Sequence, residues 1–170
     1  YTAHPEGVKA NTRGGLVVIT DPEAESYGKV VVAHGYAQGI EVYNPDLTLQ
    51  GTYHVNASTM AASNGASLFR GDQRDGKAYF SDWSDAGAGY WIFDPQAPET
   101  LTNFLQGSNN GTGAYVVDGV VIGGGATSVA FQGKGDDCKM YSYVEDYPTG
   151  NASSASGGNT LQRYDIGSAL

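Results

Sequence analysis

The strongest constraint on the fold of this chain is a repeat of close to fifty residues. The segment Lys29–His34, preceded by a glycine, returns 48 positions later as Lys77–Asp82, again preceded by a glycine. A second segment, Gly39–Pro45, returns 50 positions later as Gly89–Pro95. Repetition at a fixed period indicates that one supersecondary unit is used again along the chain. We therefore expect successive, similar units whose apolar faces are buried against one another.

A third, weaker copy follows the first two. Cys138–Tyr143 aligns with the first segment and Leu161–Ile166 with the second, and the stretch 146–158 between them is rich in Ser, Asn and Gly. Such a composition is typical of a loop. Each copy also has a candidate strand upstream, and the first two copies have one downstream: Leu16–Thr20, Ala66–Arg70 and Thr127–Gln132 upstream, and Leu47–Val55 and Thr100–Gly107 downstream.

Four short strands in each unit of 40 to 50 residues are typical of a β-propeller blade. The sequence therefore predicts an all-β fold, a propeller segment of four-stranded antiparallel blades at 14–55, 66–107 and 113–170, the last incomplete and carrying the loop insert 146–158. Propellers close with four to eight blades, and an open ring leaves sheet edges unpaired. We therefore expect the ring to be completed by further blades or by another subunit. A three-sheet β-sandwich or another β-solenoid is the alternative.

The hairpin Ala114–Ile122 has no counterpart in the first two units. Asp118-Gly119 at its centre favours a two-residue turn, because that turn needs positive φ at both positions. The hairpin is therefore either an extra element or the start of the third unit, and the sequence leaves both interpretations open.

The charge of the chain excludes some partners. The 170 residues carry a formal net charge of −9, so binding to nucleic acid or to an anionic membrane surface is not expected. No apolar run reaches the roughly 18 residues that a membrane helix needs, and we expect no membrane insertion. The only cysteine, Cys138, forms no intrachain disulfide and is expected to be buried. We expect a secreted, periplasmic or cell-surface protein.

The repeat also resembles known propeller families. Tyr79-Phe80-Ser81-Asp82 resembles the Tyr-Trp-Thr-Asp signature and the second-strand pattern of NHL-type and YncE-type propellers, and the Gly-x-x-Val/Ile-Tyr/Phe-Asn/Asp-Pro segments resemble their third strand. The resemblance extends over 14–107 and weakly over a third unit. His34 and Tyr143 stand where this signature has aspartate.

The resemblance implies a place for a ligand. Propellers bind ligands at one end of the central axis, beside the loops that join the second and third strands of each blade. Those loops are here Gly35–Gly39, Trp83–Gly89 and 144–158, and their aromatic residues are Tyr36, Trp83 and Tyr147. Aromatic side chains at one rim suit sugar stacking or a peptide partner. The alternative is that each ring covers the neighbouring blade.

His34 and Asp82 occupy equivalent strand ends in two units. A histidine and a carboxylate from adjacent blades suit a base and its orienting group, or two metal ligands, but no third ligand is evident. Asp82 alternatively caps a turn through its own backbone. Two acids in Gly133–Asp137 suit weak calcium binding, although a plain turn explains them equally simply. We expect no other cofactor.

No catalytic triad, metal cluster or phosphate loop is evident in the sequence, which therefore favours a non-catalytic recognition module that binds a protein or a glycan. One alternative is a metal-dependent hydrolase. Propellers that hydrolyse lactones hold a metal on the axis, and here Asp82 with Asn44 or Asp94 would have to converge. The other alternative is a structural subunit of a larger assembly.

Overall fold

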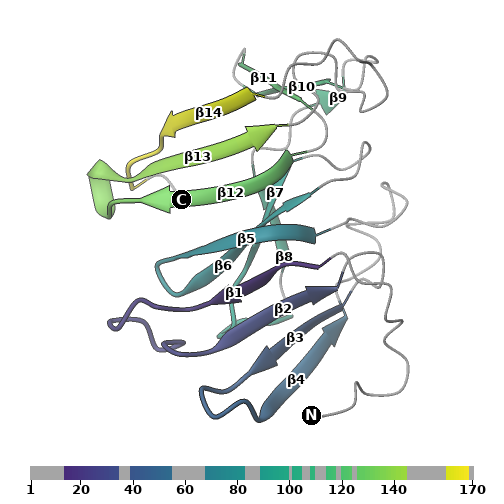
Figure 1. Ribbon diagram of the computed structural model, residues 1–170, viewed down its shortest axis with the longest axis vertical. Coiled ribbons are helices and arrows are strands. Elements are labelled where there is room, and N and C mark those ends of the chain that lie inside the picture. The colour runs from purple at the N-terminus through teal and green to yellow at the C-terminus, as the bar shows by residue number, and fades with distance from the viewer. Residues whose placement is uncertain are drawn as a thin grey trace.

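The computed structural model describes residues 14–34, 39–54, 68–82, 89–99, 101–104, 108–109, 114–117, 120–123, 126–144 and 160–168. These residues form an all-β fold of antiparallel sheets that lie one against the next (Figure 1). The described part contains no helix that is long and apolar enough to cross a membrane.

Two four-stranded sheets come first, each with its strands in chain order. The first sheet contains β1 (Leu16–Val18), β2 (Val30–His34), β3 (Gly39–Tyr43) and β4 (Leu49–His54). The second sheet contains β5 (Leu68–Arg74), β6 (Lys77–Asp82), β7 (Gly89–Phe93) and β8 (Leu101–Phe104). The repeated segments Lys29–His34 and Lys77–Asp82 thus supply the second strand of successive sheets, as the repeat predicts.

The third sheet contains β12 (Ala126–Gln132), β13 (Lys139–Val144) and β14 (Thr160–Asp165) in that order. A separate small sheet contains β9 (Ser108–Asn109), β10 (Ala114–Val117) and β11 (Val120–Gly123). The hairpin that the sequence left ambiguous is β10 and β11, and it pairs with β9 rather than with the third sheet.

The third sheet corrects one detail of the sequence alignment. Val144 and Thr160 form the last pair between β13 and β14, as His34 and Gly39 do between β2 and β3. Val144, rather than Tyr143, therefore stands at the position of His34. The alignment of Cys138–Tyr143 with the first segment is wrong by one residue, and in a strand such a slip moves every side chain to the opposite face.

A tight turn connects the first and second strands of the second sheet. Arg74 pairs with Lys77, which leaves Asp75 and Gly76 as a two-residue turn with φ of 49° and 76°. Positive φ at both positions is the geometry of a type I′ turn, whose twist matches that of the strands it joins. The turn places β5 and β6 side by side without a loop.

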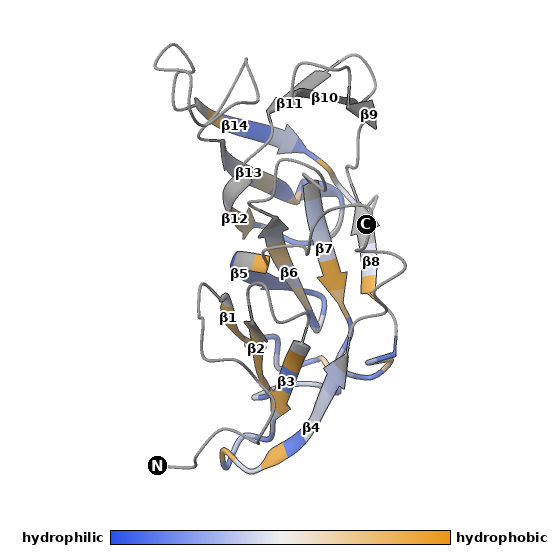
Figure 2. Cartoon of the chain, turned by 90° about the vertical axis from the view of Figure 1, so that its right-hand side faces the viewer, coloured by the Kyte–Doolittle hydropathy of each residue, from blue (hydrophilic) through white to orange (hydrophobic). Residues whose placement is uncertain are grey.

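Two apolar clusters hold the sheets together. The first lies between the first and second sheets, and the second lies between the second and third sheets. Apolar stretches of β2, β3 and β7 are visible in Figure 2. The members of the first cluster are Val17, Ile19, Val31, Ala33, Ile40, Val42, Leu68, Ala78, Phe80, Trp91 and Phe93, and those of the second are Tyr79, Tyr90, Val129 and Met140.

Polar contacts join neighbouring sheets as well. The Ser26 hydroxyl donates to the Gly76 carbonyl at 2.6 Å, and the Phe131 amide donates to the Asp72 carboxylate at 2.7 Å. The Arg74 guanidinium donates to the Gly167 carbonyl at 2.7 Å. A hydrogen bond whose partner is charged contributes roughly 1.5–3 kcal/mol. These contacts fix the relative position of the sheets more sharply than apolar packing does.

One ion pair connects the first sheet's turn directly to the third sheet. The Lys134 ammonium lies 3.0 Å from the Asp21 carboxylate, and Glu23 lies 3.9 Å from the same ammonium. The hydrogen bond from Lys134 holds the pKa of Asp21 below its ordinary value of 3.8. The same bond raises the pKa of Lys134 above its ordinary value of 10.5.

This ion pair predicts a pH dependence of stability. A lowered carboxyl pKa stabilises the fold above the ordinary value of 3.8, and the contribution is lost as the pH falls through the lowered pKa. We therefore expect Asp21→Asn to show a smaller loss of unfolding free energy than the wild type between about pH 6 and about pH 2. Urea unfolding at both pH values measures the difference. Glu23→Gln, whose carboxylate is exposed and farther from Lys134, is the control and should behave like the wild type.

Candidate functional site

The second and third strands of all three sheets meet at one end of the molecule. The terminal pairs there are His34 with Gly39, Asp82 with Gly89, and Val144 with Thr160. We call this end the rim; it lies on the right-hand side of Figure 1. The chain leaves the sheets at the rim in segments 35–38, 83–88 and 145–159. The rim is therefore where loops from three sheets begin and end.

The backbone of the innermost strands is irregular beside the rim. The register of β5 against β6 shifts between Leu68 and Gly71, and that of β12 against β13 shifts between Ala126 and Ser128. A bulge of this kind bends the strand and redirects a side chain, and bulges are enriched next to functional sites. The inner strands of the second and third sheets thus depart from regular pairing at the same end of the molecule, where the loops of these sheets begin.

A buried serine stabilises the irregular backbone of β5 by hydrogen bonds. The Ser81 side chain is fully buried, accepts from the Arg70 amide at 3.3 Å and donates to the Arg70 carbonyl at 3.1 Å. The hydroxyl thus bonds both backbone groups of Arg70, whose own position is exposed. Its guanidinium is a planar fork of hydrogen-bond donors suited to carboxylates. Sequence reasoning missed Arg70 as a candidate, because a bulge depends on strand pairing.

A buried hydroxyl pair lies just inside the rim, between the second and third sheets. The Tyr90 hydroxyl is hydrogen-bonded to the Ser142 hydroxyl, and both residues are completely buried. Burial raises the pKa of Tyr90 well above its ordinary value of 10.0. The phenol is therefore neutral at physiological pH and holds two sheets together rather than acting as a proton donor to solvent.

The five residues proposed from the sequence are only partly placed. The backbones of His34 and Asp82 end β2 and β6 at the rim, in equivalent positions of adjacent sheets, as the repeat predicts. Their side chains lie outside the described part. Tyr36, Trp83 and Tyr147 lie wholly outside the described residues, so their role in ligand binding stays a prediction.

The proposed metal-ligand set is not brought together. Asn44 and Asp94 follow the ends of β3 and β7 that lie opposite the rim, whereas Asp82 lies at the rim. The Asn44 amide donates to the Thr48 hydroxyl at 3.0 Å, and the Asp94 carboxylate accepts from the Gln96 amide at 2.8 Å. Both residues therefore stabilise turns, and the expectation that they converge with Asp82 on one metal ion is wrong.

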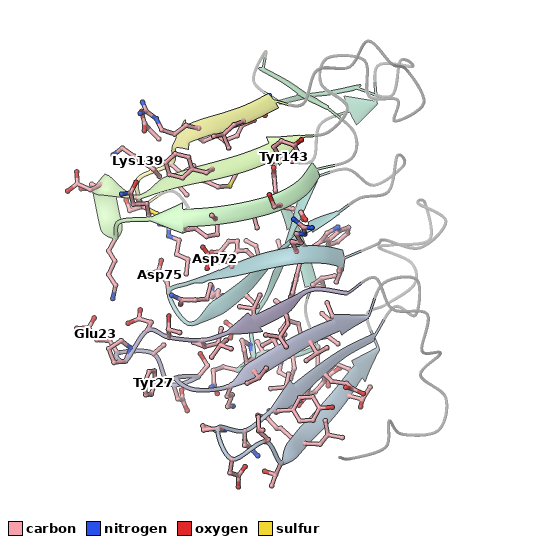
Figure 3. All side chains as sticks on the ribbon, viewed as in Figure 1. Glu23, Tyr27, Asp72, Asp75, Lys139 and Tyr143 are labelled. Carbon is pink, nitrogen blue, oxygen red and sulfur yellow. The ribbon has the colours of Figure 1, made fainter. Side chains whose placement is uncertain are left out.

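The acidic turn that suggested calcium also lies at the end opposite the rim. Gly135–Asp137 is a single 3₁₀ turn, and the Asp136 carboxylate accepts from the Ser168 hydroxyl at 2.9 Å. Within the described part, no group of three or more His, Cys, Asp or Glu residues is arranged to hold a metal ion. Glu23, Tyr27 and Asp75, labelled in Figure 3, lie at this same end.

The first sheet carries a buried carboxylate on the side that points away from the second sheet. The Tyr43 hydroxyl donates to the Glu41 carboxylate at 2.7 Å. This hydrogen bond, together with burial, raises the pKa of Tyr43 to about 12. Tyr164 and Gln162 repeat the arrangement in the third sheet, at 2.6 Å. The equivalent strands of the first and third sheets thus share a pairing that the sequence alignment alone did not suggest.

Comparison with known proteins identifies the fold. The sequence matches no protein-family model and no curated protein. Among solved structures the chain is similar to a luciferin-regenerating enzyme, with 13% sequence identity and a TM-score of 0.52. The similarity covers 88% of this chain and 43% of that chain, so this chain spans less than half of the enzyme's length. Together with the stacked antiparallel sheets, the similarity shows an all-β propeller segment.

Proposed function

We propose that this chain is a non-catalytic recognition module that binds a protein or a glycan at the rim, in a secreted or cell-surface setting. The observation that carries the proposal is that three sheets send their second-to-third-strand segments out at one end. Loops held on a rigid sheet scaffold are common sites of binding. The bulge between Leu68 and Gly71 lies beside the same end of the second sheet, where Leu68 pairs with Asp82.

The residue types at the rim suit such a ligand. Tyr36 and Trp83 belong to two different segments, so their rings offer two separate stacking surfaces. Aromatic rings contribute a large apolar area at low entropic cost and dominate many binding interfaces. Two such rings favour a ligand with flat apolar faces, which describes sugars and aromatic peptides.

The test begins with selection of a ligand. An array of neutral and acidic oligosaccharides and a displayed peptide library serve as probes, and the selected molecule is titrated by calorimetry. Trp83→Ala and Tyr36→Ala should each weaken binding by about 30-fold, the effect expected for removal of an aromatic anchor. Tyr27→Ala is the control, because Tyr27 is an exposed tyrosine at the end opposite the rim. Equal binding by all variants, or loss in the control alone, would contradict the proposal.

A metal-dependent hydrolase is the second candidate, since the similar solved structure is that of an enzyme. Asn44 and Asp94 lie at the wrong end, so any metal near Asp82 would need other ligands. Metal analysis and lactone turnover decide between the two functions. Stoichiometric calcium together with turnover that is lost in Asp82→Ala would replace the recognition proposal with the hydrolase.

A further inference from the structure

Two large apolar side chains are exposed at the end of the first sheet that lies opposite the rim. Tyr27 is 55% exposed in the turn before β2, and Leu47 is 66% exposed in the turn between β3 and β4. The two turns touch, since a β-carbon on Gly28 would lie only 2.9 Å from Pro45 Cγ. We call Tyr27 and Leu47 the turn pair.

A neighbouring sheet would not cover the turn pair. The second sheet has a neighbour on each side, and the repeat places Asp75 at the position of Tyr27 and Ala97 at that of Leu47. Leu47 and Ala97 each donate their amide to the carbonyl three residues earlier, so the two turns correspond. The Asp75 side chain is 49% exposed, and Ala97 is exposed as well. The two positions thus face solvent even where sheets lie on both sides.

The backbone of Leu47 is held in a conformation that leucine disfavours. Its φ is 64°, where the β-carbon of an L-residue crowds the following carbonyl and glycine is the usual residue. Hydrogen bonds fix the turn: the Leu47 amide donates to the Asn44 carbonyl and the Asn44 amide to the Thr48 carbonyl, both at 2.8 Å. The chain therefore holds an exposed apolar side chain in a strained position, and strain of this kind is concentrated at functional sites.

The surroundings of the turn pair are acidic. Glu23, Glu25 and Asp46 are exposed in the same two turns. The cations beside them are Lys29, which is half-buried, and Lys134, which lies 3.9 Å from Glu23 and already pairs with another carboxylate. Negative charge therefore dominates, and it favours association with a positively charged partner.

We propose that the turn pair binds a peptide segment of another protein, in which an apolar or aromatic side chain is flanked by Lys or Arg. Tyr27 and Leu47 supply the apolar contact, and the carboxylates around them supply charged acceptors for the flanking cations. An anionic membrane or a nucleic acid would be repelled by the same carboxylates. A second copy of this chain is disfavoured, because its own acidic turns would meet these.

The inference is independent of the ligand at the rim, because the turn pair lies at the opposite end of the sheets. The chain would then hold one partner at each end. The test below removes the rim aromatics first, so that its failure would leave the proposal for the rim untouched.

Selection from a displayed library of random short peptides tests the inference. The bait is the double variant Tyr36→Ala and Trp83→Ala, and the enriched peptide is titrated by calorimetry. The enriched sequences should combine an apolar or aromatic anchor with Lys or Arg. Tyr27→Ala should weaken binding of this peptide by about 30-fold, as expected for loss of an aromatic anchor. Leu161→Ala is the control: Leu161 is 70% exposed but lies on β14, and this variant should bind like the wild type.

Leu47→Gly distinguishes a binding role from a structural one. Glycine adopts positive φ without strain, so the thermal unfolding midpoint should rise by about 2 °C while the peptide binds about 10-fold more weakly. Glu25→Gln should lower the affinity at low salt and flatten its dependence on ionic strength. Enrichment of peptides without basic residues, no enrichment at all, or unchanged affinity in Tyr27→Ala and Leu47→Gly would overturn the inference.

Discussion

Trp91→Ala is expected to lower the free energy of unfolding by about 3–5 kcal/mol. Trp91 lies in the apolar cluster between the first and second sheets and is 2% exposed. Truncation removes a large buried area and leaves a cavity lined by strand side chains, which cannot collapse without moving whole sheets. Because only two apolar clusters hold the described sheets together, the loss is a large fraction of a typical domain's stability.

Urea unfolding followed by circular dichroism measures this change. Leu47→Ala is the control, since Leu47 is 66% exposed and its truncation should change the unfolding free energy by less than about 0.5 kcal/mol. An effect of Trp91→Ala as small as that of the control would mean that the first and second sheets do not pack as described.

Gly71→Val is expected to cost about 3 kcal/mol or to abolish folding. A β-carbon at Gly71 would lie against the backbone carbonyl of Tyr79, 2.7 Å from Val17 Cγ2 and 2.8 Å from Phe80 Cδ1. The carbonyl belongs to the paired strand and cannot move aside. The added side chain would therefore separate β5 from β6 or push the first sheet away from the second.

Gly51→Ala is the matched control for this substitution. Gly51 also lies within a strand, but a β-carbon there would meet only the outer end of the Tyr53 side chain and no backbone atom. Thermal unfolding of the two variants should show a large decrease for Gly71→Val and little change for Gly51→Ala. Similar midpoints would contradict the close approach of the sheets at Gly71.

Much of the fold is predictable from the sequence, because equivalent residues of the repeat occupy equivalent positions in successive sheets. Glycine with positive φ precedes both Lys29 and Lys77, and the strands that follow end at equivalent rim positions. Ala66–Arg70 is a poorer prediction, since the strand is Leu68–Arg74. The polar residues at 71–73 hide its continuation; Asp72 points its carboxylate into the contact with the third sheet.

The third sheet and the site are less predictable. Side-chain similarity matched Tyr143 with His34, although Val144 holds that position, because the strand alternates aromatic and small residues and either register matches in part. The structure resolves the register through the pairing of β13 with β14, whose last pair is Val144 with Thr160. Contacts of this kind join residues far apart in the chain, and a single sequence contains no signal for them. The bulge beneath Arg70 escaped prediction for the same reason.

The ion pair between Asp21 and Lys134 has a consequence for the order of events in folding. Its partners are 113 residues apart and sit on turns of the first and third sheets. Closing so long a loop is entropically costly until the intervening sheet is in place. We therefore expect the pair to form after the rate-limiting step, so that its removal accelerates unfolding and leaves the folding rate nearly unchanged. An ion pair that forms this late lengthens the lifetime of the native state without accelerating folding.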